Sequence, residues 1–329
     1  MRKINKLSVF VIVYAILISA WFASWLVVGD SNWWLTLLNR IVPYLFIPIP
    51  LFPILIIRSR QLKLIIVLLL PLLIFGSLYH PYLFPKPGQV RERKSELNVM
   101  TYNVLFSNQD YERVANVILT YHPDLVALQE VQPEMMSALI ERLAGEYPYF
   151  LMETENSYGT TAVFSRYAFS ESSVLDLDAD RPAVVVKTKI NSQEITFVAI
   201  HLLAYNLWWT KLKDIPATVM ERTVNQNRQA SIVLNQIADE EGIIIVGCDC
   251  NSYETSGSYR IFDQVVDNSA WNVGWLLWGD NLPGSKQDLS LQHIDYVWYK
   301  DGITPTGVYK ITDDGGSDHL PVLAIFEIN

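Results

Sequence analysis

The strongest constraint on this chain is its division into an apolar, basic head and an acidic body. Residues 1–94 carry eleven of the 25 lysine and arginine residues but only two of the 34 acidic residues, Asp30 and Glu92. The rest of the chain holds the other 14 basic and 32 acidic residues, a formal charge of −18. We therefore expect a head that faces lipid and a body that faces water.

Three apolar segments predict an anchor of about three transmembrane helices over residues 1–84. Residues 7–28 are uncharged and match the roughly 20 residues that a helix needs to cross a bilayer. A second span is expected near residues 41–57, where four prolines must kink or break any helix. A third is expected near residues 64–84, interrupted by Pro71.

Two alternatives concern this head. A basic start followed by an apolar run also occurs in cleaved signal peptides, but this run exceeds their usual length of roughly 7–15 residues and further apolar segments follow. The proline-rich second segment also fits a re-entrant hairpin, which needs protein cover at membrane depth. The sequence leaves the number of spans open between two and three.

Basic residues around the spans predict an orientation. One group precedes the first span and another separates the second span from the third: Arg2, Lys3, Lys6, Arg58, Arg60 and Lys63. Because lysine and arginine gather on the cytoplasmic side, three spans place residues 97–329 outside the cytoplasm. Trp33 and Trp34 fit the opposite interface. The basic residues of the polar linker, residues 85–96, would favour the reverse if only two spans existed.

Short β-rich runs and a few helical stretches fill residues 97–329. Strands are expected at 97–106, 125–131, 159–165, 183–190, 194–202, 243–247, 294–299 and 322–327. Apolar residues at helical spacing occur at 111–122, 133–143 and roughly 219–238. Because helices do not follow every strand, we expect packed sheets covered by helices, and no uniformly parallel sheet.

Polar side chains that can bind metal ions or move protons recur at the ends of these strands. In chain order they are Asn103, Glu130, His201, Asp249, Asn251, Asp295, Asp318 and His319. Strand ends at one rim of a sheet converge in space, so a single site can collect them all. Each residue taken singly also fits a structural role, such as a solvated strand end, a turn cap or a buried histidine. The whole set indicates a hydrolase that uses an oxygen-preferring cation.

Phosphoester hydrolysis explains why these residue types occur together. A phosphodiester repels an incoming hydroxide, and Mg²⁺ or Mn²⁺ held by carboxylate and amide oxygens neutralises that charge. A histidine can take a proton from water, or return one to the leaving oxygen, near neutral pH. A carboxylate behind that histidine sets its tautomer and raises its basicity.

In their order along the chain, these segments resemble the endonuclease/exonuclease/phosphatase (DNase I-like) superfamily. The segments are YNV with Asn103, LQEV with Glu130, the strand end at His201, GCDCN, IDY with Asp295 and SDH with His319. The resemblance covers residues 97–329 and implies an α/β fold, a four-layer α/β sandwich with its site at one sheet edge. It also implies that Glu130 is the principal metal ligand.

The same resemblance implies roles for the remaining residues. Asn103 and Asp318 would lie near the metal ion. Asp249 would orient the attacking water or a second metal ion, and Asn251 and His201 would contact the phosphoryl oxygens. The acid–base group would be His319, held by Asp295, although the sequence does not settle which histidine protonates the leaving group: His319 or His201.

Three residues depart from the family pattern or stand outside it. Cys248 and Cys250 flank Asp249, and their main interpretation is two small buried residues on one face of a strand, with a disulfide or a metal pair as the alternatives. His293 stands where the family often has a basic residue, so it is a substrate contact or a surface residue.

The acidic body and the apolar head bear on the substrate. Proteins that grip nucleic acid non-specifically use clustered lysine and arginine, and a body at −18 repels such a polyanion. An anchored domain of this type resembles a membrane-anchored bacterial group that includes teicoplanin-resistance membrane proteins. The resemblance implies a partner bilayer and a phosphate-containing substrate that is lipid-linked or exported. Trp208 and Trp209, close after His201, fit a contact with lipid or a loop buried on its own domain.

Two other functions are considered beside a membrane-anchored phosphoesterase. One is a membrane-tethered extracytoplasmic nuclease, opposed by the acidic body. The other is a catalytically inactive receptor or scaffold, which should have lost at least one of the expected ligands, whereas the sequence keeps them all. Motifs of the type GxxxxGK, GxSxG and HExxH do not occur, so NTPase, serine hydrolase and zinc protease functions have no support.

Overall fold

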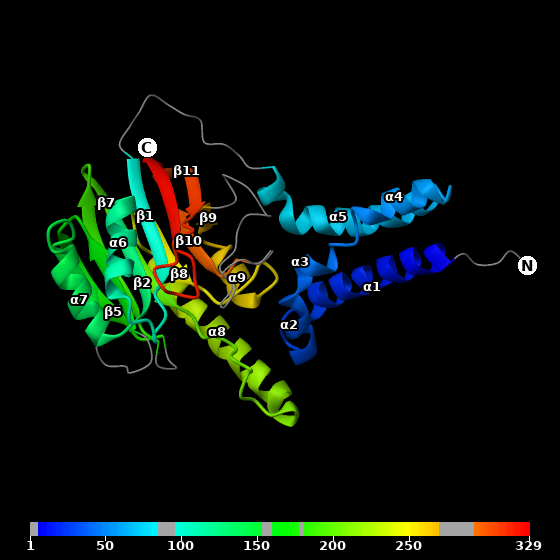
Figure 1. Ribbon diagram of the computed structural model, residues 1–329, viewed down its shortest axis with the longest axis horizontal. Helices are drawn as coiled ribbons and strands as arrows, with labels where there is room; N and C mark the ends of the chain where they lie inside the picture. Colours follow the sequence, from blue (N-terminus) through cyan, green and yellow to red (C-terminus); the bar gives the residue numbers. More distant parts are fainter. Residues whose placement is uncertain (1–5, 85–95, 153–159, 178–180, 270–292) are drawn as a thin grey trace, which may run out of the picture.

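Two six-stranded sheets packed face to face form the body of the molecule (Figure 1). The computed structural model describes residues 6–84, 96–152, 160–177, 181–269 and 293–329. Within these residues, the first sheet has the strand order β11-β12-β1-β2-β4-β3 and the second the order β5-β6-β7-β8-β10-β9. The predicted linker at 85–96 lies outside the described residues except for Glu96, which begins β1.

Both sheets are mixed, as the uneven distribution of helices predicts. The first contains β1 (Glu96–Asn103), β2 (Leu125–Val131), β3 (Tyr149–Met152), β4 (Thr160–Ser165), β11 (Ile303–Lys310) and β12 (Val322–Ile328). The second contains β5 (Phe169–Leu175), β6 (Ala183–Ile190), β7 (Gln193–His201), β8 (Ile243–Asp249), β9 (Asp267–Asn268) and β10 (Asp295–Lys300). The pairs β1–β2 and β7–β8 are parallel, and the other pairs described are antiparallel.

Alternation of side chains along the strands produces four layers. One set of strand residues, including Val99, Ala127, Phe197 and Ile245, packs between the two sheets. The opposite faces are covered by helices: α6 (Tyr111–Tyr121) and α7 (Pro133–Leu143) on the first sheet, α8 (Ile215–Ile237) and α9 (Gly257–Phe262) on the second. A short 3₁₀ turn, Leu212–Asp214, precedes α8. This arrangement confirms the predicted α/β sandwich.

The strands with strong apolar patterns are those that the sequence predicts best. The strands predicted at 125–131 and 183–190 and the helix at 133–143 match β2, β6 and α7 from end to end. The four strands at the sheet edges, β3, β5, β9 and β11, were not predicted; β5 is polar, and β11 contains Pro305 and a register shift. Edge strands bury little apolar surface, so their sequences carry a weak pattern. Residue 159 of one predicted strand lies outside the described residues.

The head differs from the predicted bundle of about three helices. Its described elements are α1 (Lys6–Val28), α2 (Trp33–Asn39), α3 (Val42–Leu45), α4 (Leu51–Arg58) and α5 (Leu64–Leu83). Two of these helices, α1 and α5, are long and apolar enough to cross a membrane. The segment expected near 41–57 forms no continuous helix, because its prolines separate α3 from α4.

The broken segment nevertheless runs the length of α1. Towards the start of α1, Val11 packs with Ile56 of α4 and Leu68 of α5. Towards its other end, Trp21 packs with Val42 of α3 and Tyr82 of α5. The chain therefore passes along the head in three sections, α1, the broken segment and α5, and only the first and last are regular helices (Figure 1).

The end of the head that faces the body is docked on the segment that follows β8. Tyr82 donates a hydrogen bond of 2.8 Å to the carboxylate of Glu254, and the indole of Trp25 donates one of 2.9 Å to the carbonyl oxygen of Thr255. Burial raises the pKa of Glu254, and the hydrogen bond from Tyr82 partly offsets that effect. Glu254 is thus a buried carboxyl group whose partner belongs to the head.

Two further contacts tie the head to the same region. The backbone N–H of Gly257 donates a short hydrogen bond to the carboxylate of Asp30. The guanidinium of Arg40 lies 4.3 Å from the ring centre of Tyr205 and 5.1 Å from that of Tyr253. Stacking of this kind stabilises a cation against aromatic faces by about 0.5–2 kcal/mol. The head is therefore a packed part of the structure.

We expect the variant Gly247→Ala to lower the thermal unfolding midpoint of the full chain. A Cβ atom at Gly247 in β8 would lie 2.6 Å from the Cβ of Ala127 in the facing sheet, so the two sheets would have to separate locally. Overpacking of a closed core costs about 1–3 kcal/mol. Gly145→Ala is the matched control, because nothing lies within 4 Å of its added Cβ. Thermal unfolding is monitored by circular dichroism. Equal unfolding midpoints for the two variants would contradict the close approach of the two sheets at Gly247.

Candidate active site

Three of the predicted site residues form a row across the second sheet. His201 ends β7, Asp249 ends β8 and Asp295 begins β10. Strand pairing places His201 opposite Asp249 and Asp249 opposite Asp295. All three have the same strand parity as the residues packed between the sheets, so the pleat turns their side chains towards the first sheet. The row therefore lies inside the rim of the sandwich.

The first sheet brings Asn103 and the SDH segment to the same rim. Asn103 ends β1, and its side-chain NH₂ group donates to Asp249 at 2.8 Å and to Glu130 at 3.2 Å. The Ser317 hydroxyl donates to the backbone oxygen of Asn103 at 2.7 Å and accepts from the backbone N–H of His319 at 3.0 Å. These contacts hold the segment before β12 against the end of β1.

Glu130 reaches this site through an unusual backbone conformation. Its strand parity is that of Leu128, which packs under the helices, so regular pleating would turn the carboxylate away from the other sheet. Instead Glu130 has φ of +62°, and the pairing of β2 with β4 shifts register between Leu128 and Val131. Bulges of this kind re-aim a side chain. The backbone N–H of Phe106 then donates to the carboxylate of Glu130 at 3.0 Å.

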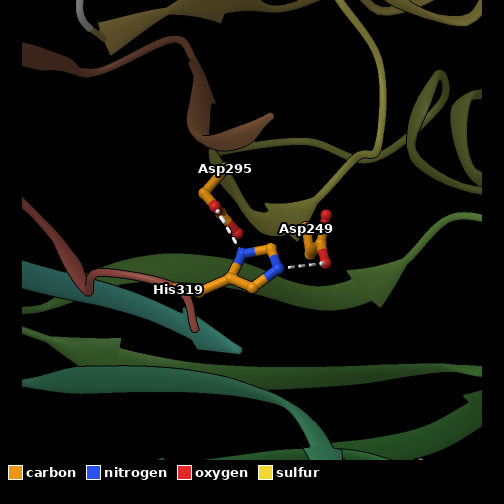
Figure 2. A group of neighbouring side chains, drawn as sticks. All are labelled: Asp249, Asp295 and His319. Carbon is orange, nitrogen blue, oxygen red and sulfur yellow. Dashed lines mark hydrogen bonds and ion pairs between the residues drawn. The ribbon is translucent and has the colours of Figure 1, made fainter. Parts of the chain in front are cut away.

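His319 lies between the two aspartates of the row (Figure 2). Its Nδ1 atom is 2.9 Å from Asp295 Oδ2, and its Nε2 atom is 3.9 Å from Asp249 Oδ2. Burial lowers the pKa of His319, but Asp295 and Asp249 outweigh it and raise the pKa to about 10. The imidazole is therefore held protonated, with one nitrogen fixed by Asp295 and the other directed towards Asp249.

Asp249 is the electrostatic centre of the site. Its Oδ1 atom accepts a hydrogen bond of 3.1 Å from the backbone N–H of Asn251, and its Oδ2 atom lies 3.3 Å from His201 Nε2. Burial and the charge of Asp295 raise the pKa of Asp249 to about 7, and the charge of His319 acts against that rise. A carboxyl group with this pKa can take up or release a proton near neutral pH.

Arg181 is a site residue that the sequence analysis missed. Its guanidinium makes a short hydrogen bond to His201 Nε2 and donates to the carbonyl oxygen of Leu202 at 3.3 Å. Burial, Arg181 and His319 all lower the pKa of His201 well below its usual value. Because Arg181 donates to Nε2, the neutral imidazole carries its proton on Nδ1, for which the described residues offer no hydrogen-bond partner.

The other two predicted residues also lie at this rim. Asn251 has φ of +46°, and its side-chain NH₂ group donates to the carbonyl oxygen of Leu202 at 3.1 Å. Asp318, next to His319, is partly buried, and burial together with Glu130 raises its pKa while the charge of His319 lowers it. All eight residues predicted from the sequence thus converge, while their individual roles remain predictions.

Two arrangements of these side chains could hold a metal ion. Asp249, Asp295 and His319 present ligand atoms within 4.8 Å of one another, but His319 would have to lose a proton before it could bind a metal ion. The predicted set is instead Glu130 with Asn103 and Asp318 nearby. In the structure the amide of Asn103 donates to Glu130 and Asp249, while its oxygen accepts from the N–H of Leu105 at 2.9 Å, so Asn103 orients the carboxylates.

The structure departs in part from the predictions for the cysteine pair and His293. Cys248 and Cys250 are both buried on the helix-covered face of the second sheet, as expected, but they are joined by a disulfide bond that the main interpretation did not favour. The ring of His293 stacks on that of Tyr82, with centres 5.6 Å apart, at the contact between head and body. The structure thus places His293 against the head.

We expect Glu130→Gly to unfold at a higher temperature than Glu130→Ala. A left-handed backbone conformation costs an L-amino acid about 1 kcal/mol or more, and glycine adopts it freely. Both variants lose the same carboxylate, so their difference isolates the backbone at φ of +62°. Thermal unfolding followed by circular dichroism measures it, and an alanine variant at least as stable as the glycine variant would disprove the strain.

The model of the Endonuclease/Exonuclease/phosphatase family matches residues 100–319, whereas curated proteins gave no significant match. One similar structure is the endonuclease/exonuclease/phosphatase from Bacteroides vulgatus, with a TM-score of 0.58, 16% identity and coverage of 72% of this chain and 100% of that chain. D. rerio TDP2 complexed with single strand DNA product has a TM-score of 0.57, 16% identity and coverage of 70% and 99%.

A third similar structure is the mannosyl-6-phosphatase Bt3783 from Bacteroides thetaiotaomicron VPI-5482. It has a TM-score of 0.53 and 16% identity, and the match covers 70% of this chain and 99% of that chain. At these identities the structures establish a shared fold and leave the substrate open. The family match itself runs from β1 to His319 and so includes all eight predicted site residues; the chain belongs to the endonuclease/exonuclease/phosphatase family.

Proposed function

We propose that this protein is a membrane-anchored, divalent-metal-dependent phosphoesterase that hydrolyses a phosphodiester or pyrophosphate bond. The observation that carries the proposal is the burial of several carboxylates beside a protonated histidine at one rim of the sandwich. Such a site combines a place for a cation with a proton donor, which phosphoester hydrolysis requires. Family membership supports the reaction class.

The donor set fits Mg²⁺ or Mn²⁺. Burial is the main cause of the raised pKa of Asp249 and of Asp318, and Glu130 raises both further, so Glu130 repels each of these carboxylates. A hard cation bound by Glu130 and Asp318, with the amide oxygen of Asn103 after rotation of the amide, would relieve that repulsion. When bound, the ion neutralises charge on the phosphoryl group and makes a bound water more acidic.

The chain's own residues divide the remaining tasks. Asp249, with a pKa of about 7, accepts a proton from the attacking water. His319, kept protonated by Asp295, donates a proton from Nε2 to the leaving oxygen. Arg181 and the amide of Asn251 lie beside His201, where they can bind phosphoryl oxygens.

Three features support a substrate at the outer face of the membrane. The head contacts the segment at 253–257, which follows Asp249 directly, so the site stays close to the anchor. The three sections of the head place the start of α1 and the body at opposite ends, which supports an extracytoplasmic body (Figure 1). The Cys248–Cys250 disulfide also suits an oxidising compartment. We therefore favour a lipid-linked phosphate ester as substrate.

A membrane-tethered nuclease is the second candidate. One structure of similar fold, D. rerio TDP2, is complexed with single-stranded DNA product. The acidic charge of the body opposes this function, because a polyanion would be repelled. The inactive scaffold has less support, since the predicted residues converge and the acid–base pair is formed.

We expect the purified full chain to hydrolyse a small soluble phosphodiester with Mg²⁺ or Mn²⁺ and to lose that activity in EDTA. His319→Ala and Asp249→Asn should each lower kcat by about 10²–10⁴-fold, because each removes a proton-transfer group. His122→Ala is the matched control: His122 also contacts a carboxylate, Glu146, at 2.9 Å, but on the exposed surface. A wild-type rate in His319→Ala would remove the mechanism.

Substrate preference is tested with the same proteins. Isoprenoid pyrophosphates and sphingomyelin-like diesters in vesicles are compared with plasmid DNA at equal phosphate concentration. The acidic surface and the anchored position predict a higher kcat/KM for the lipid substrates. Faster cleavage of DNA, abolished by both Asp249→Asn and His319→Ala, would instead establish the nuclease.

A further inference from the structure

The loop between β7 and α8 presents large apolar side chains to solvent. Trp208 and Trp209 are each 92% exposed, and Leu212 is 87% exposed, the highest values among the large apolar residues described. Side chains this exposed leave a large apolar area in contact with water. Removing such area from water would contribute about 25 cal/mol of favourable free energy per Å². Two lysines, Lys211 and Lys213, lie in the same segment. A surface of this composition is typical of binding to a partner or a membrane.

Hydrogen bonds hold the first part of this loop on the body. The backbone N–H of Leu203 donates to Gln229 at 2.9 Å, and Gln226 donates to the carbonyl oxygen of Leu203 at 3.0 Å. Further along, the hydroxyls of Tyr205 and Thr223 are 2.8 Å apart. The loop therefore leaves the body from a fixed base on the middle of the long helix α8, and the exposed tryptophans follow that base.

The head also contacts this loop, and the contact fixes the position of the loop relative to the head. Arg40, which directly follows α2, stacks on Tyr205 at 4.3 Å, so the loop base is fixed to the body-side end of the head. In Figure 1 the free end of α8 points to the side from which α1 and α5 extend, and it lies near α2. The exposed segment thus lies where a membrane crossed by α1 and α5 would have its outer surface.

The head carries the same kind of side chain at that level. Trp33 and Trp34, at the start of α2, are 38% and 45% exposed just after the end of α1. Tryptophan collects at the boundary between headgroups and acyl chains, where its apolar ring and its N–H group are both accommodated. The helix that begins with this pair, α2, contacts α8, the helix that follows the exposed loop.

We propose that residues 208–212 insert into the outer headgroup–acyl boundary of the membrane that the head crosses. Trp208, Trp209 and Leu212 bury apolar surface there, while Lys211 and Lys213 reach lipid phosphates. This inference rests on the membrane anchoring in the proposed function and deepens it. The inserted residues begin seven positions after His201, on the loop that leaves β7 at the site, so insertion holds this side of the site near the level of the lipid headgroups.

The test uses the full chain in nanodiscs with an environment-sensitive fluorophore on a single introduced cysteine. The native cysteines are buried and bonded to each other, so they do not compete for the label. Trp208→Cys carries the test label, and its 92% exposure makes the substitution structurally mild. Leu17→Cys, 63% exposed within α1, reports the span, and Val174→Cys, 46% exposed on β5 at the far end of the body, reports water (Figure 1).

Lipids carrying a nitroxide near the headgroup should quench the label at position 208 by about half or more, because an interfacial segment lies within roughly 5–10 Å of the headgroup region. The label at Val174 should keep its intensity. If nitroxides deep in the lipid acyl chains quench the label at position 17 but headgroup nitroxides do not quench the label at 208, the proposed insertion of the loop is wrong and the anchor is supported. No quenching at either position overturns the anchor and with it this inference.

Discussion

Buried negative charge is the constraint on which the rest of this structure depends. Glu130, Asp249, Asp295 and Asp318 meet at one rim, where water cannot screen them fully, and each must find a compensating group. His319 provides one such group through its contacts with two of them. Arg181, which bonds to His201 and interacts electrostatically with Glu130 and Asp249, provides a second.

Strand geometry brings these groups together. A single rule, the alternation of side chains along a strand, directs His201, Asp249 and Asp295 inward, and antiparallel or parallel pairing sets them side by side. Glu130 breaks that rule through its positive φ. Strained backbone of this type persists only where the surroundings enforce it, and it clusters at functional sites.

The sequence predicted the parts that obey local patterns. The apolar alternation of β1, β2, β7 and β8 placed the strand ends, and the polar residues found there did converge. Arg181 was missed because it stands alone just before β6, outside any motif, and only the folded chain brings it to His201. A basic residue directly before a predicted buried strand was the one available signal. The contact between Tyr82 and Glu254 depends on groups 172 positions apart, which no local pattern reveals.

The docking of the head on the segment after β8 limits which other membrane anchors the body can be joined to. Asp30, Trp25 and Tyr82 hydrogen-bond to backbone and carboxyl groups of the body that are buried in the complete chain. Joining the body to an unrelated transmembrane helix would remove the hydrogen bond that Tyr82 donates to Glu254. Chimeras that exchange only the head should therefore fold poorly, and natural variation in the two halves should be correlated across their junction.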